Sequence, residues 1–154
     1  MHDAYRIADE PAESPLSKLA VSPLWPMLAV MFGGAGLSWS WFALNSFAIG
    51  SASRKRELTT IALGLGLTIG IGLLAIAGYA HFIGQRDYFA YAMLPVVACK
   101  LLFCYRLQLM QTRSYELYKY FGGISRNGAA VLLLGYFVRQ SLFHLPLLWA
   151  LVLS

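Results

Sequence analysis

The sequence predicts an all-α, polytopic integral membrane protein built as a bundle of four transmembrane helices. Of its 154 residues, 58% are hydrophobic and only 12% are charged, whereas about a quarter of residues are charged in soluble globular domains. The apolar residues gather in four stretches, and each is long enough to cross a bilayer as a helix of roughly 20 residues. We therefore expect one membrane domain over residues 24–154.

Residues 1–23 are expected to form a polar N-terminal tail. They contain four acidic residues and three prolines, and they lack the apolar core of a cleavable signal peptide. Insertion would then depend on the first span itself. With no transit peptide or lipidation motif, the compartment that we expect is a bacterial inner membrane.

The first span is predicted over residues 24–50. Gly34 and Gly36 are each followed by a serine four positions later, a spacing that allows close helix packing. Asn45 carries an amide that lipid cannot satisfy, so we expect it to bond another helix or a backbone carbonyl.

The second span is predicted over residues 58–83 and is uncharged. Small residues recur every four positions along it and predict close contact between helices. We expect a tight hairpin with the first span; a homodimer face and a glycine-lined substrate path are the alternatives. The small residues form two ladders, one of Thr60, Gly64, Thr68 and Gly72, and one of Ala62, Gly66 and Gly70.

The third span is predicted over residues 88–110, with a polar continuation that forms either a cytoplasmic helix or a helix lying along the interface at about 106–126. Polar residues three or four apart fall along one stripe of this helix. Beyond Gln108 we expect the stripe to face solvent. Its members are Lys100, Cys104, Gln108, Gln111, Tyr115 and Lys119.

The fourth span is predicted over residues 127–154. Basic residues number three between spans one and two and four between spans three and four when Arg106 at the end of span three is counted, against two in the tail and one in the 84–88 turn. Because basic loops stay in the cytoplasm, this bias predicts that both termini are periplasmic.

Lys100 and Arg139 each lie about halfway along a predicted span, where an ionisable group is a functional-site candidate by default. Their side chains could instead snorkel to the headgroups. If the two bases face each other, they could hold an anion, a lipid phosphate or an acidic residue of another protein. Gln140 and His144 are near enough in sequence to assist.

The sequence gives little support for catalysis. The three histidines are scattered, and His144 in the fourth span has no cysteine or carboxylate near it as a ligand set or triad. Cys99 and Cys104 are about 140° apart around a helix, so a disulfide is not expected. We expect no enzyme, no metal and no cofactor. The net charge of +5 comes from basic residues that lie at the ends of apolar spans and do not form a solvated patch. This distribution argues against a nucleic-acid partner.

Short glycine motifs resemble those of a known group of proteins. Phe32-Gly33-Gly34 is followed by Asn45 and Gly50, and Gly122-Gly123-Ile124-Ser125 precedes the last span. This pattern resembles small uncharacterised bacterial inner-membrane proteins in which a glycine-rich first span ends in Asn and Gly. The resemblance implies a bacterial inner membrane and no activity.

Together these observations predict a non-enzymatic membrane subunit or accessory protein that acts through helix–helix and lipid contacts. Its partners would be the bilayer and either another membrane protein or a second copy. One alternative is an anion- or lipid-binding transporter component built around Lys100 and Arg139. Another is an immunity protein against a membrane-active toxin.

Overall fold

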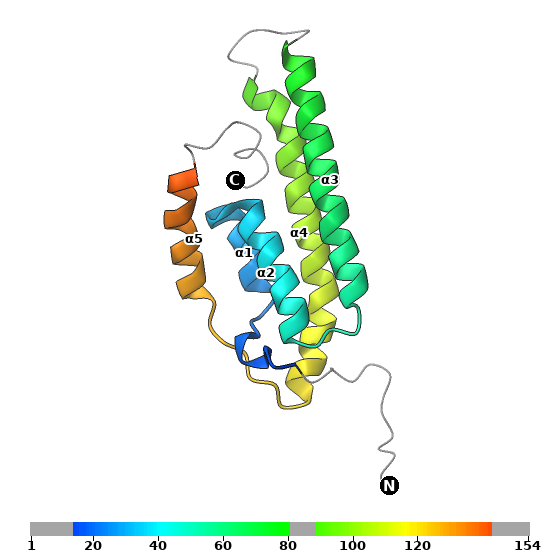
Figure 1. Ribbon diagram of the computed structural model, residues 1–154, viewed down its shortest axis with the longest axis vertical. Coiled ribbons are helices and arrows are strands. Elements are labelled where there is room, and N and C mark those ends of the chain that lie inside the picture. The colour runs from blue at the N-terminus through cyan, green and yellow to red at the C-terminus, as the bar shows by residue number, and fades with distance from the viewer. Residues whose placement is uncertain (1–13, 81–88, 143–154) are drawn as a thin grey trace.

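The computed structural model describes residues 14–80 and 89–142, and this part of the chain is all-α (Figure 1). The predicted all-α class is confirmed. Two helices, α3 and α4, are long and apolar enough to cross a membrane, which is compatible with membrane insertion; four spans are not shown. The elements are a short 3-10 helix η1 (Ser17–Leu19), α1 (Leu24–Phe32), α2 (Gly34–Ala48), α3 (Arg54–Gly78), α4 (Phe89–Tyr120) and α5 (Ala129–Leu142).

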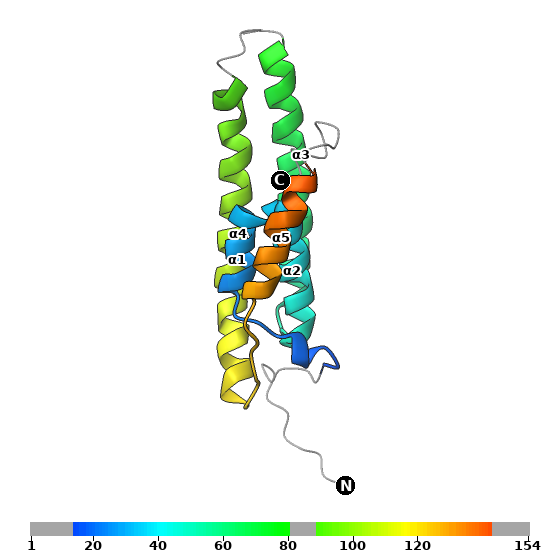
Figure 2. The ribbon, with the colours of Figure 1, turned by 90° about the vertical axis from the view of Figure 1, so that its left-hand side faces the viewer.

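The first expected span is two helices instead of one. The chain reverses at Gly33 and Gly34, where Gly34 adopts φ +84°, a conformation that glycine takes without a steric penalty. α1 and α2 then lie side by side in opposite directions (Figures 1 and 2), and the Ser38 hydroxyl donates to the Pro26 carbonyl across them at 2.7 Å. The expectation of one helix over residues 24–50 is therefore wrong.

Both ends of this helical hairpin lie at the same end of the bundle, which we call the basal end and define as residues 14–23, 45–57 and 111–126. The 15 residues of α2 extend about 22 Å from it at 1.5 Å per residue. The turn at Gly33 and Gly34 is thus nearer to the basal end than the thickness of a bilayer core, which is about 30 Å.

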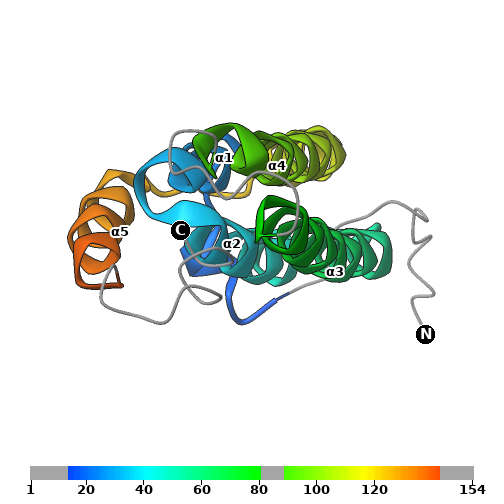
Figure 3. The same cartoon turned by 90° about the horizontal axis from the view of Figure 1, so that it is seen from above.

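The hairpin lies between α5 on one side and the long antiparallel pair of α3 and α4 on the other (Figure 3). Its packing against α4 forms the main apolar core. That core consists of Val30, Ala35, Trp39, Phe42, Cys104 and Leu107.

One small-residue ladder of α3 is buried against α4. A Cβ added to Gly64 would lie 2.9 Å from the Phe103 ring, so the absent side chain is what allows α4 to approach. Gly72 is buried on the same face of α3. From the sequence we expected this ladder to pack against the first span. Its close partner is instead α4.

Candidate functional site

A buried carboxylate occupies the centre of the basal end. Glu57 lies in the first turn of α3 and is fully buried. One of its oxygens accepts hydrogen bonds from the Ser51 hydroxyl and, at 2.6 Å, from the Ser53 hydroxyl. Its other oxygen accepts from the Gln111 side-chain nitrogen at 2.8 Å. These three donors stabilise an acid that would be costly to bury without partners.

Gln111 on α4 joins this carboxylate to the hairpin. Its amide nitrogen also donates to the Phe42 carbonyl at 2.7 Å, and its oxygen accepts from the Asn45 amide at 3.0 Å. The Asn45 oxygen in turn accepts from the backbone N–H of Val21 at 3.0 Å. The expectation that Asn45 bonds another helix is confirmed.

Only one orientation of the Gln111 side-chain amide is compatible with these hydrogen bonds. Rotating the Gln111 amide by 180° would place its oxygen against both the Phe42 carbonyl and the Glu57 carboxylate, which are acceptors only. Because each member forms a hydrogen bond with the next, the network fixes four parts of the chain relative to one another. These parts are helices α2, α3 and α4 and the segment that precedes α1. We call Asn45, Glu57 and Gln111, with the serines at 51 and 53, the basal network.

The basal network corrects one expectation about α4. Gln111 was expected on a solvent-facing stripe, but it is fully buried. Cys104 and Lys100, on the same stripe, are also buried, and Lys100 is 7% exposed. The stripe exists at the expected spacing, but over residues 100–111 it faces the protein, because the hairpin covers it. Glu57 was not identified as a site residue, since it lies at the end of its span.

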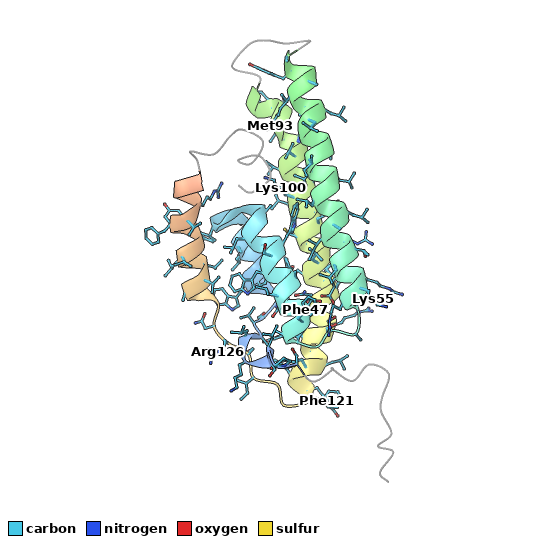
Figure 4. The ribbon with its side chains drawn as sticks, in the orientation of Figure 1. Phe47, Lys55, Met93, Lys100, Phe121 and Arg126 are labelled. Atoms are coloured by element: carbon cyan, nitrogen blue, oxygen red, sulfur yellow. The ribbon has the colours of Figure 1, made fainter. Side chains whose placement is uncertain are left out.

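Lys100 and Arg139, the two bases expected halfway along their spans, both lie near the turn of the hairpin. Lys100 lies on α4 about 16 Å from Gln111, at 1.5 Å per residue, on the level of that turn (Figure 4). A guanidinium nitrogen of Arg139 on α5 donates to the Met31 carbonyl at 2.7 Å, in the last turn of α1. The two positive charges are close enough to repel each other.

Each base also has a structural role. Arg139 lies at the C-terminal end of α1, where the helix dipole favours a cation. Its bond to Met31 ties α5 to the hairpin. His144 and the side chain of Gln140, which were expected to assist, lie outside the described residues.

The remaining expected residues lie in different environments. Gly34 makes the turn and Gly64 the contact with α4, while Gly36 is half-buried in α2. Gly66 and Gly70 face open space. Both cysteines are free, and Cys104 lies within 3.3 Å of the Ser38 hydroxyl.

Between residues 14 and 142, the gap at 81–88 aside, no group of three or more His, Cys, Asp or Glu side chains could hold a metal ion. Comparison with models of known families, with curated proteins and with solved structures finds no match for this chain.

Proposed function

We propose that this protein is a non-enzymatic accessory subunit of a bacterial inner membrane that acts through helix–helix and lipid contacts. The observation that carries the proposal is the outward face of α3. Ala62 and Gly66 are exposed, and a Cβ added to Gly66 or Gly70 would meet nothing within 4 Å. The neighbouring Leu63 and Leu67 are 62% and 50% exposed.

The two ladders of α3 suggest what this face does. The ladder of Gly64 is already used, because α4 approaches it through Phe103. The ladder of Gly66 has the same four-residue spacing, and none of the described residues covers Gly66 or Gly70. In a bilayer such spacing lets the backbone of a second helix approach closely, which provides packing where the hydrophobic effect cannot.

We further propose that the basal end faces the cytoplasm. Basic side chains collect there, and cytoplasmic segments are enriched in lysine and arginine. Residues 14–23 would then also be cytoplasmic. This differs from the periplasmic N-terminus expected above, because that expectation took residues 24–50 to cross the bilayer once. The basic residues of this end are Lys18, Arg54, Lys55, Arg56, Arg113, Lys119 and Arg126.

Site-specific photocrosslinking in native membranes tests the outward face. A photoreactive residue at Leu67 is expected to capture a protein partner or a second copy. Replacing Gly66 and Gly70 by leucine should abolish the product without disturbing the fold, since both positions have open space. The matched control is Gly78→Leu, which also meets open space but is the last residue of α3, about two turns beyond the last glycine of the ladder. A lipid adduct alone, or an equal product in all variants, would contradict the proposal.

A transporter component that binds an anion or a lipid is the second candidate. It is favoured by the helical hairpin, because non-helical backbone at membrane depth occurs where it is buried in protein or lines a cavity, and interrupted helices often form transport sites. Lys100 and Arg139 lie beside the turn. Native mass spectrometry of the Lys100→Met, Arg139→Met variant should then show loss of a bound anion or lipid. Unchanged retention would exclude this candidate.

A further inference from the structure

A hollow of about 660 Å³ opens at the basal end, where the start of α3 faces the lower half of α4. This volume falls within the usual range of roughly 300–1,000 Å³ for small-molecule sites. Its lining combines cationic, hydroxyl and aliphatic side chains. They include Arg56 and Ser53 from the α3 side and Leu109, Arg113, Ser114 and Leu117 from α4.

The cationic part of the hollow comes from two helices. Arg56 and Arg113 both line it, and within residues 14–80 and 89–142 neither guanidinium forms a hydrogen bond or an ion pair. Each carries planar donors that match the oxygens of a phosphate group. Two such groups lining one hollow from separate helices suit an anion with several oxygens.

The buried acid next to Arg56 in the sequence, Glu57, is not part of the hollow. Glu57 does not line the hollow, and its oxygens already accept from Ser51, Ser53 and Gln111. Arg54 is also accounted for, since its guanidinium lies 4.8 Å from the centre of the Phe47 ring. Arg56 and Arg113 are therefore the two cationic groups of α3 and α4 directed to the hollow.

The aliphatic part of the hollow indicates which phosphate compound fits. Leu109 and Leu117 flank Arg113 on the same helix and remain 53% and 38% exposed. Phosphate contacts beside an apolar wall match a phospholipid, whose headgroup would meet the arginines while the first carbons of an acyl chain meet the leucines. The hollow also lies at one end of the two membrane-length helices, where headgroups lie.

We propose that this hollow binds a phosphate group through Arg56 and Arg113, and that its occupant is an anionic phospholipid. The inference depends on the proposed function only for placing the basal end at headgroup level. The arginine pair does not involve the outward face of α3, so either proposal can fail without the other.

Native mass spectrometry of the whole chain, extracted from vesicles that contain phosphatidylglycerol and phosphatidylcholine, tests the site. We expect preferential retention of phosphatidylglycerol. This retention should weaken at least about tenfold in the Arg56→Gln, Arg113→Gln variant, because two charge-assisted contacts to the phosphate are lost. The matched control, Lys119→Gln with Arg126→Gln, removes two charges from the same end but outside the hollow. Its retention should change less than about threefold. Circular dichroism checks that all variants keep their helix content.

Two further arms distinguish the sources of phosphate. Leu117→Gln should weaken phosphatidylglycerol retention but leave the binding of inorganic phosphate, followed by ³¹P NMR, unchanged. Equal losses in the arginine and control variants would overturn the site, because they would indicate diffuse attraction to the basic end. Binding of inorganic phosphate without any preference for phosphatidylglycerol would overturn the lipid as occupant.

Discussion

Replacing Gln111 by leucine tests whether the basal network stabilises the fold. Leucine is close to glutamine in size, so the packing of α4 is kept while the hydrogen bonds are lost. Three buried groups would lose a partner: the Phe42 carbonyl, one oxygen of Glu57 and the Asn45 amide. A buried group without its partner costs about 1–3 kcal/mol. Hydrogen bonds between helices in bilayers average only about 0.6 kcal/mol.

These limits place the loss for three groups between about 2 and 9 kcal/mol. We expect about 3 kcal/mol, toward the lower limit, because Glu57 keeps its two serine donors and the unfolded chain finds other partners within a membrane. The measurement is the free energy of unfolding in mixed micelles, followed by circular dichroism during titration with sodium dodecyl sulfate.

The matched control for this variant is Gln108→Leu. Gln108 lies on the same helix, is half-buried, and its side chain forms no hydrogen bond among the described residues. Its replacement should change the free energy of unfolding by less than about 0.5 kcal/mol, as expected away from such networks. If Gln111→Leu were no more destabilising than Gln108→Leu, the reasoning about the basal network would be refuted.

Three further predictions use the same unfolding measurement. Gly34→Ala should destabilise the protein by about 1–2 kcal/mol, because φ is positive at this position. Gly66→Ala should stabilise it by about 0.5–1 kcal/mol, because the added methyl group lies in open space within a helix. If Gly66→Ala were the more destabilising of the two, the turn at Gly34 would be contradicted. Gly64→Leu should destabilise by at least about 1–3 kcal/mol, since the side chain would overlap Phe103; a neutral effect would mean that α3 and α4 do not pack through this face. Arg139→Met should cost about 1–2 kcal/mol through its lost bond to α1, and an unchanged stability would show that α5 is held by other contacts.

The sequence predicted the helical class and the length of α3 because both depend on local composition. It did not predict the break in the first span. Hydropathy treats residues 24–50 as one apolar run, and a hairpin buried in a bundle remains apolar on both arms. The available signal was the pair Gly33 and Gly34 at the centre of the run, together with Ser38, Asn45 and Ser46, three polar residues that are all buried in α2.

The candidate site was predictable only in part. The spacing of Lys100, Cys104 and Gln111 correctly placed them on one face of α4, but the periodicity of a single helix does not tell whether that face meets water, lipid or protein. Glu57 and Gln111 are 54 residues apart, and their pairing depends on which helices become neighbours. Asn45 was the better predicted residue, because an amide inside a span needs a partner whatever the topology.

The most direct test of the account is the side of the membrane from which residues before and after the α1–α2 hairpin can be reached. Single cysteines at Lys18, Lys55 and Ala80, in a chain without its native cysteines, would be labelled in sealed vesicles with an impermeant maleimide. The structure predicts that the first two react from the same side and Ala80→Cys from the other. Labelling of Lys18→Cys and Lys55→Cys from opposite sides would mean that residues 24–50 cross the membrane once, which would contradict the hairpin.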